Sequence, residues 1–182
     1  MWRASAYILF LCLLMLTASA QAGTPITHDM AQRYFENCLK LAPITTPDMK
    51  PETQKRYCAC TAKTMMGTMS QEDLKALGSK DPITARTATN KVIVDVNAPC
   101  TRYPIHDMLQ NKCMTDLGNA AICSCLSTKM AAYVETQSKA LLAPILQKNP
   151  NIYDPTAPIV NSPEFQAMEK KIALGCATNP TQ

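Results

Sequence analysis

The sequence has few of the residues and motifs from which common active sites are built. It contains two histidines, five glycines and only 5% aromatic residues among its 182 positions. No G-x-S-x-G, H-E-x-x-H or glycine-rich phosphate-binding motif occurs in it. These absences argue against the usual classes of serine hydrolase, metalloprotease and nucleotide-binding enzyme, and we expect a protein without enzymatic activity.

The sequence also lacks a large excess of positive or negative charge. Eighteen Lys and Arg residues face 14 Asp and Glu residues, for a net charge of +4. The basic residues are scattered and are not interleaved with aromatic residues, whereas a nucleic-acid groove needs clustered cations and stacking rings. We therefore expect no nucleic-acid partner, and the 47% hydrophobic content is enough for a globular core.

Long hydrophobic runs are missing except for one near the N-terminus. Residues 8–16 are all apolar, follow Arg3, and precede an A-x-A sequence at Ala18 to Ala20. A bilayer-spanning helix needs about 20 apolar residues. The pattern therefore predicts a signal peptide over residues 1–20 and a mature chain from Gln21. An uncleaved anchor is the alternative. We expect a periplasmic or secreted protein with no membrane insertion after signal cleavage.

Cysteine, by contrast, is abundant. Nine cysteines occur in the chain, and eight remain once Cys12 of the predicted signal peptide is removed. An even number in an oxidising compartment predicts four disulfide bonds. The eight fall into two successive C…CxC…C series: Cys38, Cys58, Cys60 and Cys100, then Cys113, Cys123, Cys125 and Cys176.

Residues around the cysteines recur as well. A His-Asp-Met sequence precedes the first cysteine of each series, at residues 28–30 and 106–108, and similar Lys, Thr and Met residues follow each CxC. We interpret the chain as a tandem duplication, with one unit over residues 21–102 and another over residues 103–182.

Local patterns within each unit are helical. Met30, Tyr34, Cys38 and Leu41 share one helix face. This helix is expected to begin after Thr27 or Asp29 as the N-cap and to be ended by Pro43 and Pro47. A capping box at residues 70–73 begins another helix. The last helix of each unit starts with a capping residue and a proline, Asp81-Pro82 and Ser162-Pro163. The fold class is therefore predicted to be all-α, with duplicated, disulfide-bonded three-helix units.

Two segments are harder to interpret. Residues 91–96 are rich in β-branched side chains and favour a strand by propensity, but their repeat counterpart over residues 164–174 is plainly helical, so we expect a helix. Residues 143–161 contain four prolines and are predicted to form a long, irregular surface loop.

The midpoints of possible bridges favour one pairing. In an antiparallel hairpin, bridged residues lie equally far from the turn. The pairs Cys38–Cys58, Cys60–Cys100, Cys113–Cys123 and Cys125–Cys176 have midpoints at turn-forming residues near 48, 80, 118 and 150. Exchanging the two members of a CxC moves a midpoint by one residue, so that alternative stays open. Side chains two residues apart on a helix diverge by about 200°, which lets each CxC reach two neighbours.

By elimination, the sequence favours a non-enzymatic protein-binding module, such as an inhibitor, an immunity-type protein or an envelope accessory protein. The best candidate for the contact is the proline-rich loop, because it carries apolar residues that a solvated linker would lack. We expect Ile152, Tyr153 and Ile159 to contact the protein partner. The alternative is that these side chains cover the end of the second helical unit. The sequence specifies neither the partner nor the oligomeric state.

Two other functions are weighed against this one, although no cofactor is expected. A copper-handling protein would use His28, Met30, His106 and Met108, since imidazole and thioether groups suit copper. The alternative to copper binding is a structural one, in which Asp29 and Asp107 are helix N-caps and the methionines pack in the core. A thiol–disulfide oxidoreductase would use a CxC pair, but every cysteine has a counterpart with which to bond.

Overall fold

The computed structural model describes residues 23–45 and 49–180, and this part of the chain consists of helices joined by short non-helical segments. The only β-type pairing among these residues is an isolated bridge between Pro25 and Ser70. The predicted signal peptide and the start at Gln21 lie outside the described residues. The helices, in order, are α2 (His28–Thr45), α3 (Pro51–Thr68), α4 (Gln71–Leu77), α5 (Pro82–Lys91), the π-helix η1 (Val92–Asn97), α6 (Ala98–Cys100), α7 (Arg102–Leu117), α8 (Ala120–Lys148), α9 (Thr156–Val160) and α10 (Pro163–Thr178).

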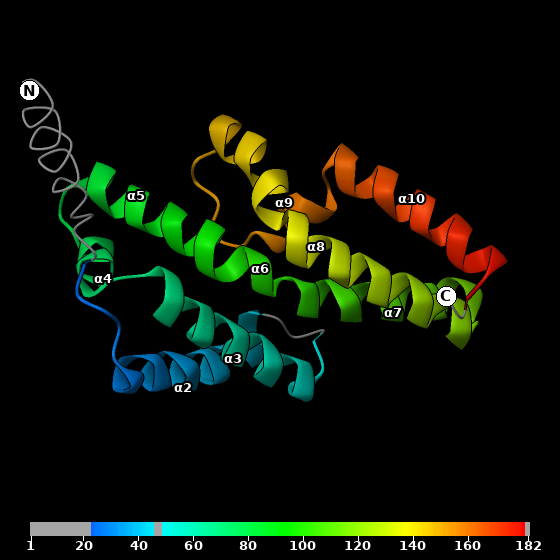
Figure 1. The fold of residues 1–182 in the computed structure, drawn as a ribbon, viewed down its shortest axis with the longest axis horizontal. Helices are drawn as coiled ribbons and strands as arrows, with labels where there is room; N and C mark the ends of the chain where they lie inside the picture. Colours follow the sequence, from blue (N-terminus) through cyan, green and yellow to red (C-terminus); the bar gives the residue numbers. More distant parts are fainter. Residues whose placement is uncertain (1–22, 46–48, 181–182) are drawn as a thin grey trace, which may run out of the picture.

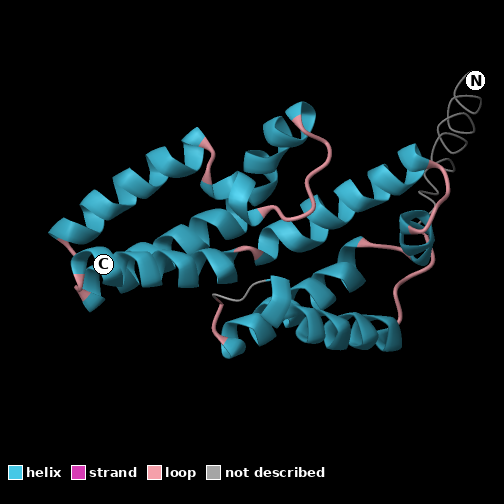
Figure 2. Cartoon of the chain, turned by 180° about the vertical axis from the view of Figure 1, so that it is seen from behind, coloured by secondary structure: helices cyan, strands magenta, loops and turns pink. Residues whose placement is uncertain are grey.

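One long row of helices runs through the middle of the molecule. It consists of α5, η1, α6 and α7, which follow each other almost without interruption (Figure 1). The α2–α3 hairpin packs on one side of this row, through contacts of α3 with η1 and α7. Helices α8, α9 and α10 lie on the other side, as the view from behind also shows (Figure 2). The all-α prediction is thus confirmed.

Two hydrophobic clusters meet at η1. Ile93 belongs to the larger cluster, which is built mainly from α7, α8 and α10, whereas Val96 belongs to the smaller cluster with residues of α3. Both side chains are almost fully buried. Residues 91–96 are therefore helical, as expected, and they supply side chains to both clusters. The division into duplicated units at residue 102 stays a prediction.

The predicted helix ends are largely confirmed. Ser70 and Asp73 form a reciprocal capping box at α4, and the side chains of Asp81 and Ser162 cap α5 and α10. Gly118 ends α7 with a φ of 64°, in the left-handed region that favours glycine. These ends could be predicted because each depends on only a few consecutive residues.

The predicted irregular loop over residues 143–161 is wrong for most of its length. Helix α8 continues through Pro144 to Lys148, and α9 covers residues 156–160. A proline inside a helix costs about 3 kcal/mol. Burial of Leu141 and Leu142 in the larger cluster, just before Pro144, offsets that cost. The loop is therefore reduced to residues 149–155. Helix α2 ends at Thr45, between the two prolines expected to end it.

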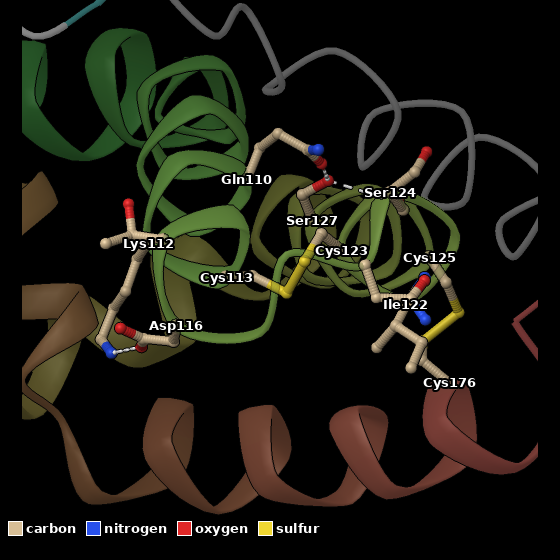
Figure 3. The surroundings of a disulfide bond; sticks show 12 residues. Gln110, Lys112, Cys113, Asp116, Ile122, Cys123, Ser124, Cys125, Ser127 and Cys176 are labelled. Atoms are coloured by element: carbon tan, nitrogen blue, oxygen red, sulfur yellow. Dashed lines mark hydrogen bonds and ion pairs between the residues drawn. A yellow bond between two sulfur atoms is a disulfide. The ribbon is translucent and has the colours of Figure 1, made fainter.

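Four disulfides join the helices in the pairing that the midpoints favoured. Cys38–Cys58 joins α2 to α3, and Cys60–Cys100 joins α3 to α6. In the other half, Cys123 bonds to Cys113 of α7 while Cys125 turns away and bonds to Cys176 of α10 (Figure 3). Each CxC thus links its own helix to two neighbours.

Such a disulfide-rich helical structure is compatible with an exported protein. None of the helices within residues 23–45 and 49–180 combines the length and the apolar character that a membrane span requires.

Candidate functional site

A cavity of about 450 Å³ lies where the α2–α3 hairpin meets the loop over residues 149–155. Its walls come from α2, α3, η1, the start of α7 and the end of the loop. Three of the lining residues are tyrosines, Tyr34, Tyr57 and Tyr153. We refer to it as the tyrosine cavity. Its volume falls in the range of about 300–1,000 Å³ typical of ligand sites.

The Cys38–Cys58 disulfide holds two of these tyrosines near each other. Tyr34 lies one helical turn before Cys38 on α2, and Tyr57 directly precedes Cys58 on α3. The Cα atoms of the two cysteines are 5.6 Å apart. Because the bridge fixes α2 against α3, it also limits how far the tyrosine-bearing walls can separate.

The phenols of Tyr34 and Tyr57 are neutral at physiological pH. Burial raises the pKa of Tyr34, and a hydrogen bond with Thr61 opposes this only in part. Burial also raises the pKa of Tyr57, and the nearby Tyr34 and the Asp154 carboxylate raise it further. The cavity therefore offers two neutral, electron-rich rings beside one carboxylate.

The loop over residues 149–155 closes the cavity from the opposite side. Tyr153 is 69% exposed. Its hydroxyl accepts a 3.0 Å hydrogen bond from Nη2 of Arg86, whose guanidinium carbon lies 5.0 Å from the ring centre. Asp154 accepts a 2.9 Å bond from the Thr156 amide, and Pro155 is buried. These contacts give the short loop a definite conformation at the cavity mouth.

The three residues expected to contact a partner have different environments. Ile152 is 8% exposed and Ile159 is fully buried, with Ile159 packed in the larger hydrophobic cluster. Both therefore attach the loop and α9 to the protein itself, which is the structural alternative weighed for them. Tyr153 is exposed and lines the cavity. Of the three, it is the one available to a partner.

The four residues of the copper hypothesis do not share one environment. His28 is exposed at the start of α2, and Met30 packs against the smaller hydrophobic cluster. His106 and Met108 lie on α7, where the ring nitrogens of His106 contact Asp107 and Ser127. Among the described residues, no group of three or more His, Cys, Asp or Glu side chains is placed to hold a metal ion.

The suggested capping function of Asp107 is wrong, because α7 begins five residues earlier, at Arg102. The Asp107 carboxylate is buried and instead accepts a 3.4 Å hydrogen bond from the backbone amide of Lys50, directly before α3. A carboxylate at a helix N-terminus is favoured by the helix dipole. Asp107 therefore attaches the start of α3 to α7. At α2, the Thr27 hydroxyl accepts a bond from the Met30 amide and acts as the cap.

Asp107, His106 and Ser127 form a chain of contacts that superficially resembles a catalytic triad. Nδ1 of His106 lies 3.3 Å from Oδ1 of Asp107, and Nε2 lies 3.3 Å from Oγ of Ser127. However, Ser127 is fully buried, and its hydroxyl lies closer to Oε1 of Gln110, at 2.9 Å (Figure 3). Ser127 also lies in the interior of α8. Backbone amides there donate to carbonyl groups of the helix, so they do not form an oxyanion hole next to Ser127. This arrangement connects α7 to α8.

The tyrosine cavity was missed at the level of sequence, although a signal for it exists. By its sequence pattern, Tyr34 lies on the helix face assigned to the core, and Tyr57 marks only the start of a helix. Once Cys38 is paired with Cys58, the positions of both tyrosines relative to their cysteines place them near each other. Asp154 and Pro155 were passed over because they were treated as part of an irregular loop.

Comparison of the chain with known protein families, curated proteins and solved structures finds no match. Function is therefore inferred from the chemistry of the tyrosine cavity and from the disulfide-bonded fold around it.

Proposed function

We propose that this chain is an exported, non-enzymatic binding protein that docks a protein partner at the tyrosine cavity. The observation that carries the proposal is the cavity itself, with exposed Tyr153 on one wall and exposed Leu41 on another. Tyrosine is enriched at the energetically important centres of protein interfaces, because its ring buries a large area while its hydroxyl still finds a partner.

The apolar surface beside the cavity supports this proposal. Leu41, at the cavity wall, is 55% exposed, and Ile44, three residues further along α2, is 77% exposed. Exposed single apolar residues are common on proteins, but apolar side chains next to an aromatic cavity are typical of interaction sites. An inhibitor, an immunity-type protein or an accessory subunit of an envelope complex would use such a surface.

The predicted signal peptide and the four disulfides support export to the periplasm or the secreted space. Disulfides also favour binding, since a preorganised surface loses little conformational freedom when a partner docks. The Cys38–Cys58 bridge acts directly at the cavity wall, because Cys38 itself lines the cavity.

The proposal is tested by capture from the envelope fraction with matched variants. Leu41→Lys places a positive charge at the cavity wall and is expected to abolish capture of a specific partner. Leu174→Lys is the control, because Leu174 is 72% exposed on α10 and does not line the cavity. A photocrosslinking residue at position 153 is expected to join covalently to the same partner. Equal capture by both variants would contradict docking at this site.

Export is tested separately. N-terminal sequencing of the purified protein is expected to find a mature chain that begins at Gln21 or Gly23. Retention of Met1 on a membrane-bound product would contradict export as a free protein.

A further inference from the structure

The tyrosine cavity has the chemical features of a site for a positively charged group. We propose that it receives a basic side chain, the ammonium group of a lysine or the guanidinium group of an arginine, which the protein partner presents. This inference rests on the proposed function, because it specifies the partner chemistry that the same cavity recognises.

The negative charge of Asp154 is the first feature that favours a cation in the cavity. Asp154 is the only charged residue among the described residues that line the cavity. Its carboxylate accepts a hydrogen bond from the Thr156 amide and has no ion-pair partner among the salt bridges of the described residues. A cation that enters the cavity therefore meets one uncompensated negative charge beside walls of low polarity, where Coulomb attraction is stronger than in bulk water.

The aromatic walls of the cavity are the second feature that favours a cation. The faces of neutral tyrosine rings carry partial negative charge and attract cations. Tyr34 and Tyr57 keep this property because burial raises the pKa of both phenols. Aromatic walls with a nearby carboxylate are the general means by which proteins recognise ammonium groups. An anionic ligand would be repelled by Asp154, and a purely apolar ligand would leave the charge of the carboxylate uncompensated.

The protein already uses the same chemistry at the cavity mouth. Arg86 of α5 places its guanidinium over the Tyr153 ring, with 5.0 Å between the guanidinium carbon and the ring centre. Arg86 does not itself line the cavity. This contact holds Tyr153 in place and leaves the cavity formed by Tyr34, Tyr57 and Asp154 for a cation from outside. A volume of about 450 Å³ is large enough for a long side chain.

The experiment titrates the oxidised mature protein with amide-capped lysine and with amide-capped norleucine, a neutral analogue of similar shape. The signals of isotopically labelled tyrosine rings are followed by NMR and assigned by single Tyr→Phe replacements. Capped lysine is expected to shift the signals of Tyr34 and Tyr57, and capped norleucine is expected not to. Equal binding of the two probes would overturn the inference.

Variants separate the contributions of charge and ring. Asp154→Asn is expected to weaken lysine binding about fivefold, whereas Asp29→Asn, which removes an exposed charge that does not line the cavity, is expected to leave it unchanged. Tyr57→Phe retains the ring and is expected to keep binding, but Tyr57→Leu is expected to abolish it. Unchanged binding in both Asp154→Asn and Tyr57→Leu would overturn the inference.

A third probe distinguishes the source of the cation. Choline is a small quaternary ammonium that aromatic sites also bind. Binding of choline without binding of capped lysine or capped arginine would overturn the assignment to a partner side chain. If capped lysine binds but Leu41→Lys leaves partner capture intact, the docking proposal fails while the cation site stands. If capture is lost in Leu41→Lys and neither basic probe binds, the docking proposal stands and this inference fails.

Discussion

Arg86 and Tyr153, which are 67 positions apart in the sequence, are joined by two interactions at the mouth of the tyrosine cavity. Nη2 of Arg86 donates a 3.0 Å hydrogen bond to the Tyr153 hydroxyl, and the guanidinium lies over the ring. The pair connects α5, before the central π-helix, to the loop that follows α8. A change in α5 is therefore expected to alter the loop that closes the cavity.

Arg86→Met is expected to loosen this loop without unfolding the protein. The lost hydrogen bond and cation–π contact should lower the free energy of unfolding by about 1 kcal/mol. Hydrogen exchange at the amides of Asn151 and Thr156, which bond to side chains within the loop, should accelerate. Arg33→Met, on the exposed surface of α2, is the control. Equal exchange in the two variants would show that Arg86 does not hold the loop.

The disulfides are expected to differ in their contribution to stability according to the chain length that each one closes. Cys125–Cys176 encloses 51 positions and Cys113–Cys123 encloses 10. Replacing both cysteines of a pair by alanine should cost about 4 kcal/mol for the longer loop and about 3 kcal/mol for the shorter, because the longer loop loses more entropy in the unfolded chain when it is closed. Urea unfolding of the two variants measures the difference. A larger loss for the shorter loop would contradict this account.

Two glycines are expected to respond to alanine substitution with opposite signs. A Cβ atom at Gly23 would lie 2.7 Å from both Oε2 of Glu72 and Cβ of Ser70, so Gly23→Ala should destabilise the protein by about 1 kcal/mol. A Cβ atom at Gly67 would meet no atom within 4 Å. Because Gly67 lies within α3, Gly67→Ala should stabilise by about 0.5 kcal/mol. Thermal unfolding checks both, and a shift of the same sign in both would be inconsistent with these packing environments.

The attachment of the N-terminal segment to α4 is expected to weaken in acid. The side chain and amide of Thr24 both donate to the Glu72 carboxylate, and the side-chain hydrogen bond is the largest cause of the lowered pKa of Glu72. A carboxyl group with a lowered folded-state pKa adds stability above its unfolded pKa, and this stability is lost as the pH falls through the folded value. The protection factor of the Thr24 amide, which is its exchange rate relative to an unstructured peptide at the same pH, should therefore fall below a pH of about 4. In Glu72→Gln this fall should be absent.

Ser127 is expected to contribute to stability and not to catalysis. Ser127→Ala removes the buried hydrogen bond to Gln110 and should lower the free energy of unfolding by about 1 kcal/mol, whereas Ser124→Ala, on the exposed face of α8, should be nearly neutral. A fluorophosphonate probe, which labels activated serines, should leave Ser127 unmodified. Labelling of Ser127 would indicate a hydrolase and would contradict a non-enzymatic protein.

The sequence predicts well those features that depend on short segments or on the symmetric spacing of cysteines about a turn. The caps at Ser70, Asp81 and Ser162 depend on three or four neighbouring residues. Midpoints that fall on turns favour the observed disulfide pairing, although they do not distinguish it from exchange of the two cysteines within a CxC. The extension of α8 through Pro144 could not be predicted in this way, because burial of its leucines in the larger cluster outweighs the local preference of proline.

The candidate site was only partly predictable for a similar reason. Tyr153 was identified because it lies in a proline-rich segment with apolar residues, but the same argument selected Ile152 and Ile159, which the fold buries. Whether an apolar residue faces a core or a partner depends on tertiary packing. The cavity also requires Tyr34 and Tyr57, which are placed near the loop by the packing of the α2–α3 hairpin on the central row of helices.

The four disulfides share one further property, which is the order of their cysteines along the sequence. Among the described residues, every bridge joins a cysteine to the next one along the sequence: 38 to 58, 60 to 100, 113 to 123, and 125 to 176. The four rings therefore follow each other without overlapping. In a chain that crosses a membrane N-terminus first, each newly arrived second cysteine finds its native partner as the only unpaired thiol already across. Oxidation in step with translocation thus produces the native set directly, and no disulfide exchange is needed to correct it.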